Sequence, residues 1–233
     1  MITTLAEIKV RKKISDSLFL LTAKLEKYKE WVPGTFMQIS LDMKSASNYW
    51  LDSRAFSFAS WGSPEARILV RKEGFFTTEL VSRAEKGFLT SVRYPFGDFL
   101  LNSETDKVFL AGGAGISVFL SHFDFIKANG KSNQKILIFY TAKETEEDFS
   151  NIYEATVSDN IIIHQFFTDP TSNRYTGRMN TKIILEKIGD IKSKEFYICG
   201  PPKFNKYWIE ELKEFGIRPI LEQWENASED ETK

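Results

Sequence analysis

VFLAGGAGIS, residues 108–117, is the stretch that decides how the rest of the chain is interpreted. A short apolar run enters three glycines, and apolar side chains then recur at helical spacing: Ile116, Phe119, Leu120, Phe123 and Ile126. A strand that passes through glycines into a helix presents unpaired N–H groups and partial positive charge, and residues without Cβ let a pyrophosphate approach. The spacing is not G-x-G-x-x-G, so a tight turn without a ligand is an equal alternative for this motif alone.

The chain on the C-terminal side of this stretch alternates strands with helices. The predicted strands are 108–111, 135–140, 160–167 and 195–199, and the predicted helices are 117–128, 146–157, 181–188 and 203–215. Continuous apolar strands separated by helices indicate a parallel sheet covered on both faces. The sequence therefore predicts a doubly wound α/β domain over residues 104–225, followed by a polar tail at 226–233.

The chain on the N-terminal side is predicted to be mostly β structure. Short apolar or alternating runs punctuated by turn residues predict strands at 6–10, 18–23, 35–41, 54–60, 66–71 and 89–94. One helix is predicted over 79–84, with Thr77 or Thr78 as its cap. Six short strands at this spacing are typical of a small antiparallel barrel, which we expect to occupy residues 1–103.

Composition narrows the class of protein. The 233 residues carry a formal net charge of −1, which gives no reason to expect a nucleic-acid partner. Cys199 is the one cysteine, and His122 and His164 are the two histidines, so we expect neither a disulfide framework nor a metal site. No apolar run is long enough to span a bilayer, and Met1–Lys13 lacks the hydrophobic core of a signal peptide. We therefore expect a cytoplasmic protein.

Four short motifs occur in an order known from one family. Arg54-Ala55-Phe56-Ser57 resembles the Arg-x-Tyr-Ser flavin motif of the ferredoxin–NADP reductase superfamily, and Gly74-Phe75-Phe76-Thr77 resembles its second, phosphate-binding flavin motif. The glycines at 112–115 resemble its nicotinamide-nucleotide loop, and Cys199-Gly200-Pro201 resembles its Cys-Gly-Pro strand end. The resemblance covers nearly the whole chain. It implies an FAD-binding barrel followed by an NAD(P)-binding domain.

The resemblance also implies roles for residues of the barrel. Arg54 is expected to bind the flavin pyrophosphate, for which a guanidinium is a fixed-charge fork. Phe56, where the family more often has Tyr, is expected to lie against the isoalloxazine face, and Ser57 is expected to bond near the flavin N5. Gly74, Thr77 and Thr78 are expected to hold the second phosphate at a helix start. The alternatives are a surface charge at Arg54, an in–out strand pair at 56–57 and an ordinary helix cap.

In the second domain the resemblance places the nucleotide pyrophosphate at the carboxyl edge of the sheet, over Gly112, Gly113, Gly115, Ile116 and Ser117. The family usually has Thr-Pro after Gly-Ile, whereas this chain has Ser117-Val118, so Ser117 keeps a hydroxyl for capping or ligand contact.

The end of the chain completes the implied site. Cys199, with Gly200 and Pro201, is expected near the nicotinamide as a positioning residue; a buried small apolar residue is an equal alternative. Glu222 is expected to polarise the site or relay a proton, and Trp224 to cover the flavin. An exposed acid on a terminal strand is a comparable interpretation of Glu222.

Nucleotide preference depends on the charge near the ribose. Asp169 occupies a position where phosphate-binding relatives often carry Arg, which favours NADH over NADPH. Lys143, Arg174 and Arg178 are cations that can still reach a 2′-phosphate.

The resulting hypothesis is a flavoenzyme that moves a hydride from NAD(P)H to FAD and passes electrons to a separate acceptor: a ferredoxin, a flavodoxin, a partner protein or a ferric chelate. The alternatives are an electron-transfer subunit of a larger complex and a non-catalytic flavin- or nucleotide-binding module.

Overall fold

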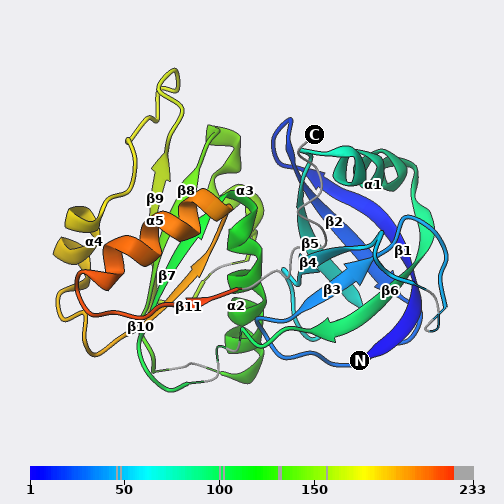
Figure 1. Cartoon of the computed structure of the whole chain (residues 1–233), viewed down its shortest axis with the longest axis horizontal. Helices are drawn as coiled ribbons and strands as arrows, with labels where there is room; N and C mark the ends of the chain where they lie inside the picture. Colours follow the sequence, from blue (N-terminus) through cyan, green and yellow to red (C-terminus); the bar gives the residue numbers. More distant parts are fainter. Residues whose placement is uncertain are drawn as a thin grey trace.

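The chain folds around two sheets that share no strand (Figure 1). The computed structural model describes residues 1–222 apart from 46, 48, 100, 102, 131, 132 and 156. Trp224 and the tail at 226–233 therefore lie outside the described residues. We call the part from β1 to β6 the first lobe and the part from β7 to β11 the second lobe. The predicted division at residue 103 falls in the connection between them.

The first lobe is an antiparallel six-stranded sheet in the order β4-β3-β6-β1-β2-β5. Its strands are β1 (Ile2–Lys13), β2 (Leu18–Leu25), β3 (Phe36–Ile39), β4 (Arg54–Ser57), β5 (Glu65–Arg71) and β6 (Phe88–Phe96). Beyond the end of β4, the Ala59 amide donates to the Arg67 carbonyl (2.7 Å) and the Arg67 amide to Ser60 Oγ (2.8 Å). These bonds join the two edge strands, so the sheet curls into a nearly closed barrel, as the alternating runs predict.

Helix α1 (Phe75–Lys86) begins four residues earlier than the sequence predicts. Gly74 is its N-cap residue, and Thr77 lies inside the first turn, where its hydroxyl accepts from the Gly74 amide (3.2 Å) and the Glu73 amide (3.1 Å). The prediction that Thr77 or Thr78 caps a helix starting at 79 is therefore wrong. Thr77 satisfies backbone donors by reaching back to the cap, and this adds a turn that the propensities of Phe75 and Phe76 do not indicate.

The second lobe is a parallel sheet in the order β11-β10-β7-β8-β9. Its strands are β7 (Lys107–Gly112), β8 (Ile136–Ala142), β9 (Ile161–Phe167), β10 (Glu195–Cys199) and β11 (Ile220–Leu221). Helices α2 (Ser117–Asn129) and α3 (Phe149–Ile152) cover the face toward the barrel, whereas α4 (Thr181–Ile188) and α5 (Pro202–Lys213) cover the other (Figure 1). The strand order therefore reverses at β7, and a crevice opens beyond the ends of β7 and β10.

The predicted helix over 146–157 is wrong. The structure has a short 3₁₀ turn at Thr145–Glu147 and then α3, which is four residues long. Asp148 interrupts the helix because its backbone is extended (φ −56°, ψ 139°) and its carboxylate accepts from the Ser150 amide at 2.9 Å. The preceding Glu147 turns inward and is fully buried, so the acid-rich sequence does not form one solvated helix face.

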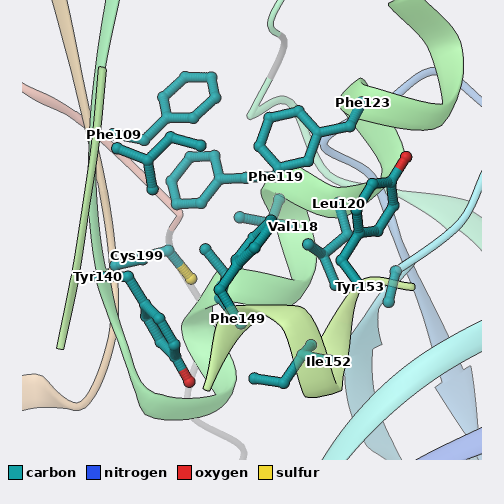
Figure 2. Packing of buried hydrophobic residues seen from close by; sticks show 14 of the residues in the cluster. Phe109, Val118, Phe119, Leu120, Phe123, Tyr140, Phe149, Ile152, Tyr153 and Cys199 are labelled. Atoms are coloured by element: carbon teal, nitrogen blue, oxygen red, sulfur yellow. The ribbon is translucent and has the colours of Figure 1, made fainter. Parts of the chain in front are cut away.

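An apolar core extends across the boundary between the lobes. Phe109 of β7 stacks on Phe119 of α2 with ring centroids 4.2 Å apart, and Figure 2 shows these rings and Phe123 packed together between sheet and helix. The same buried cluster includes first-lobe side chains: Ile14, Leu18, Leu20, Ala59 and Leu69. Burial of this shared surface fixes how the lobes sit relative to each other.

A polar cluster reinforces that arrangement. Asp124 of α2 accepts from Arg67 Nη2 of β5 at 2.6 Å, from the Trp61 amide at 3.2 Å and from the Tyr153 hydroxyl at 3.0 Å. Because Asp124 and Arg67 are mostly buried, this ion pair is less screened by water than a surface pair. The barrel and α2 are thus joined by a charged contact as well as by packing.

No helix among the described residues is both long enough and apolar enough to cross a membrane.

Candidate functional site

A cleft lies where the carboxyl ends of β7 and β10 face the barrel. It has a volume of about 270 Å³. The first lobe supplies Phe56, Ser57, Arg71, Glu73 and Thr77 to its walls, and the second lobe supplies Gly112, Gly113, Gly115, Ser117, Cys199, Gly200 and Pro201. The structure therefore brings both flavin-like motifs and both nucleotide-like motifs to one cleft.

The glycines of the loop bring three backbone segments into close contact. A Cβ on Gly115 would lie 2.3 Å from the carbonyl oxygen of Cys199. A Cβ on Gly112 would lie 3.1 Å from Cγ of Phe204, and one on Gly200 would lie 2.6 Å from Cδ1 of the same ring. Glycine is thus required at 115 and 200 for the turn after β7 to pack against the end of β10. This close packing is a reason for glycine that the sequence interpretation, based on ligand access alone, does not include.

The start of α2 is built differently from the expectation for Ser117. The loop forms a 3₁₀ turn over Gly113–Ile116, and α2 follows it directly. Ser117 has helical dihedrals and its side chain does not cap the helix, so the predicted capping role is wrong. Its side chain does line the cleft, where ligand contact remains open to it. Ile116 is fully buried in the apolar core and does not line the cleft.

Glu222 joins the two lobes at the cleft. Its Oε1 accepts from the Ser57 hydroxyl of β4 at 2.7 Å, and its Oε2 accepts from the Cys199 thiol of β10 at 2.8 Å. All three side chains are buried, with Glu222 only 5% exposed. The interpretation of Glu222 as an exposed terminal acid therefore does not hold. The structure places the three predicted catalytic residues in one hydrogen-bonded cluster.

Burial changes the acidity of this cluster. Loss of water raises the pKa of Glu222 from 4.5 to about 7, although the hydrogen bonds from Cys199 and Ser57 act to lower it. Burial, together with the adjacent Glu222 charge, raises the pKa of the Cys199 thiol well above its ordinary value. Cys199 therefore stays protonated near neutral pH and is a poor nucleophile, whereas Glu222 can gain or lose a proton there.

The flavin-like motif on β4 divides between the cleft and its rim. Phe56 is buried and lines the cleft, with Phe76 of α1 6.3 Å away in a stacked arrangement. Arg54 is exposed, donates to its neighbouring Ser53 carbonyl at 3.0 Å and lies 5.5 Å over the Phe76 ring. It does not line the cleft. Arg54 is thus held beside the cleft by local contacts, at the edge of its β4 wall.

The second flavin-like motif lies at the start of α1. Thr77 lines the cleft, and Gly74 precedes it at the N-cap, where the helix terminus carries partial positive charge. Thr78 is exposed and points elsewhere in the first turn, outside the cleft lining. Of the two threonines, Thr77 is therefore the one placed to contact a bound anion.

Sequence reasoning missed Arg71, which lines the cleft at the end of β5. Its guanidinium faces Gly113, where a Cβ would lie 3.2 Å from Nη2, and it forms an ion pair with the buried Glu147 at 2.8 Å. A basic residue that ends an alternating strand is the available signal. Its partner cannot be identified from the sequence, because the pattern around Glu147 predicts a helix that does not form.

A second depression, about 880 Å³ in volume, adjoins the first at Pro201. Lys143, Asp169 and Arg178 line it, together with Lys203 and Tyr207 of α5. Arg174 does not line it, because this side chain pairs with Asp148 at 2.6 Å and lies over the Phe167 ring. Two of the three predicted cations therefore flank Asp169, and Lys203 is a third that the sequence did not single out.

Comparison with known proteins agrees with this geometry. Residues 109–209, from β7 to α5, match the family model of the oxidoreductase NAD-binding domain. The chain is 29% identical over 190 residues to a Na(+)-translocating NADH-quinone reductase subunit of Yersinia pestis (strain Pestoides F), a match that covers 70% of this chain and 46% of that protein. The corresponding protein of Shewanella denitrificans is 31% identical over 145 residues, covering 56% and 35%. The chain thus spans about half the length of these curated relatives.

Solved structures share the whole fold. The ferredoxin reductase in carbazole 1,9a-dioxygenase superimposes with a TM-score of 0.76 at 17% identity, covering 94% of this chain and 68% of that one. A ferredoxin NADP+ reductase from Neisseria gonorrhoeae, with bound FAD and NADP, superimposes with a TM-score of 0.72 at 17% identity, covering 93% and 92%. By its NAD-binding domain, its relatives and its two-lobed fold, the chain belongs to the ferredoxin–NADP reductase superfamily of FAD- and NAD-binding oxidoreductases.

Proposed function

We propose that this chain is a flavoprotein that moves a hydride from NAD(P)H to FAD and passes the electrons to a separate acceptor. The observation that carries the proposal is the Glu222 cluster, in which one buried carboxyl group is bound by Ser57 from the first lobe and Cys199 from the second. Such a cluster places a group that can exchange a proton near pH 7 at the junction of the two lobes.

The residues of the cleft fit both dinucleotides. Phe56 offers an apolar ring face for an aromatic ring system, and the start of α1 and the turn at Gly113–Ile116 offer backbone N–H groups for phosphates. Arg71 and Thr77 add side-chain donors to the same walls. In this proposal Phe56 and Thr77, with Arg54 at the rim, hold FAD, and the glycine loop with Pro201 holds the nicotinamide nucleotide.

The chain's own residues position reactants and hold a proton. FAD, when bound, supplies the chemistry that accepts a hydride and releases single electrons. Ser57 and Cys199 fix the two carboxyl oxygens of Glu222, so the proton is held at a defined place at the cleft. The burial of Phe56, Ser57 and Cys199 keeps water from this region, which favours transfer to the intended partner.

The acceptor is proposed to be a separate protein, such as a ferredoxin, a flavodoxin or a partner subunit, or else a ferric chelate. A second candidate function, an electron-transfer subunit of a larger complex, is favoured by the sequence matches to a component of an NADH-quinone reductase. The single cysteine leaves no cysteine set for an iron–sulfur cluster in this chain, so the proposed onward transfer uses a group on another molecule.

The test of the proposal is the colour of the protein. We expect the purified protein, incubated with FAD and desalted, to keep a yellow flavin spectrum, which NADH or NADPH bleaches under anaerobic conditions. Candidate acceptors should then restore the colour at different rates, and the fastest identifies the acceptor class. A protein that retains no FAD and oxidises no NAD(P)H would instead be a non-catalytic module, and the proposal would fail.

Asp169 is proposed to favour NADH, and Asp169→Arg should shift the preference toward NADPH. The carboxylate lies in a wall with Lys143, Arg178 and Lys203, so charge reversal there removes repulsion and adds a fork for a 2′-phosphate. We expect the NADPH/NADH ratio of kcat/KM to rise roughly tenfold, equivalent to about 1.4 kcal/mol. Asp148→Asn, which changes an acid outside this wall, serves as the control. An unaltered ratio in Asp169→Arg would remove this residue from the specificity argument.

A further inference from the structure

Arg71 and Glu147 form an ion pair between the two lobes. Arg71 Nη1 donates to Oε1 of Glu147 and Nη2 donates to Oε2, both at 2.8 Å, in an end-on bidentate arrangement. Nη1 also donates to Ser17 Oγ at 2.8 Å, and Ser15 Oγ donates to Glu147 Oε1 at 3.0 Å. Glu147 is completely buried, and the Arg71 side chain is 19% exposed. This geometry fixes the guanidinium more tightly than a surface ion pair would.

The remaining donors of Arg71 face the glycine loop. A guanidinium has five N–H groups, and among the described residues Arg71 uses three, two on Nη1 and one on Nη2. The unused N–H groups are on Nε and Nη2, which form the side edge of the guanidinium. A Cβ on Gly113 would lie 3.2 Å from Nη2 and 3.7 Å from Nε, so this edge is directed at the turn. The cleft wall therefore contains a two-donor fork that the protein leaves available.

We propose that Glu147 and Ser17 position Arg71 so that its Nε/Nη2 edge binds a phosphate group of a dinucleotide held at the Gly113 turn. The inference rests on the proposed function, because it assigns a partner for the phosphates of FAD or NAD(P)H. A planar two-donor edge matches two phosphate oxygens. Glu147 acts through Arg71 and is a positioning residue.

The charges around the cleft make this role specific. Glu73 lines the same cleft, and Glu147 lies behind Arg71, so Arg71 offsets two acids close to the place where phosphate oxygens would lie. Without Arg71 this wall is negative and repels phosphate. Without the Glu147 charge, a guanidinium still held by Ser17 attracts phosphate more strongly.

The experiment compares ligands that differ in their phosphates. Binding of FAD is measured against riboflavin, and binding of NADH against reduced nicotinamide riboside, which separates the two sources of phosphate. Arg71→Ala should weaken one phosphate-bearing ligand roughly 10- to 100-fold and leave its phosphate-free counterpart unchanged. Glu147→Gln should tighten the same ligand about 3- to 10-fold while lowering thermal stability. A merely structural pair would not produce these opposite signs.

Two further variants keep the test decisive. Arg71→Ala leaves Glu147 buried and unpaired, so the double variant Arg71→Met, Glu147→Leu removes both charges in a form expected to fold. It should show the same loss for the phosphate-bearing ligand. The matched control is Arg67→Ala, which breaks the other ion pair between the lobes, away from the cleft. It should lower stability without changing the preference for phosphate-bearing ligands.

The outcomes separate this inference from the proposed function. If the wild-type protein binds neither FAD nor NADH, the proposed function fails and the inference fails with it. If the wild type binds them and the Arg71 variants keep the full preference for phosphate-bearing ligands, or lose affinity equally for both members of a pair, only the inference is overturned. A selective loss in the FAD pair or in the NADH pair assigns the fork to that ligand.

Discussion

Gly115→Ala should cost this protein most of its nicotinamide-nucleotide binding. The new Cβ would lie 2.3 Å from the Cys199 carbonyl oxygen, 2.6 Å from its carbon and 2.8 Å from the Gly200 nitrogen. All three are backbone atoms, so no side chain can move aside and the loop has to shift by about 1 Å, a displacement that can cost on the order of 100-fold in a catalytic step. We expect kcat/KM for NADH to fall about 100-fold and the free energy of unfolding to fall by about 1–3 kcal/mol.

The measurement is steady-state NADH oxidation together with chemical denaturation. FAD retention should change little, because Gly115 lies in the second lobe and the proposed flavin contacts are mainly in the first. Gly74→Ala is the stability control, since a Cβ there meets no atom within 4 Å and φ is −124°, and it should cost under about 1 kcal/mol. Wild-type NADH kinetics in Gly115→Ala would show that the loop does not need this close approach.

Glu222→Gln should slow hydride transfer and remove its dependence on pH near neutrality. The amide keeps the size of the carboxyl group and an acceptor for Ser57, but it cannot exchange a proton. Loss of a positioned acid–base group reduces rates by about 100-fold or more. Stopped-flow reduction of the flavin by NADH between pH 5 and 9 is the measurement. An unchanged rate and pH profile would exclude Glu222 from proton handling.

The same substitution has a signature in stability. The pKa of Glu222 is about 7 in the folded protein and 4.5 is its ordinary value, so the folded state binds the proton more tightly. Its contribution to stability is therefore fully present below pH 4.5 and is lost as the pH rises through about 7, a change of about 3 kcal/mol. Glu222→Gln should lack this component of the pH dependence. Glu186→Gln, at an exposed acid on α4, should retain it.

Hydrophobic periodicity predicted both sheets because their strands are buried in regular patterns. The apolar runs at 108–111 and 195–199 became the paired strands β7 and β10, and the alternating run at 66–71 became β5. A strand buried on both faces needs continuous apolar residues, whereas a barrel strand needs alternation, so each pattern carried its own architecture. The glycines of the loop were recognised for the same reason: few other residues fit such a turn.

The misses all involve side chains whose partners are distant in sequence. The pattern at 146–157 suggested an amphipathic helix, but the ion pair of Glu147 with Arg71 and the local cap at Asp148 favour a turn. Arg54 carried the motif, yet the guanidinium that lines the cleft is Arg71. The burial that raises the pKa of Glu222 depends on strands from both lobes. Such contacts arise from tertiary structure and leave no local signal.

The apolar cluster that includes Leu18 and Leu69 of the barrel together with Phe109 and Phe119 has a consequence for cooperativity. Two lobes that share one interior cannot melt separately without exposing that interior to water, so heating should produce a single transition. The cleft between them then keeps its width whether or not a ligand is present. Nucleotides enter a preformed slot, and the entropic cost of closing two loosely hinged halves is avoided.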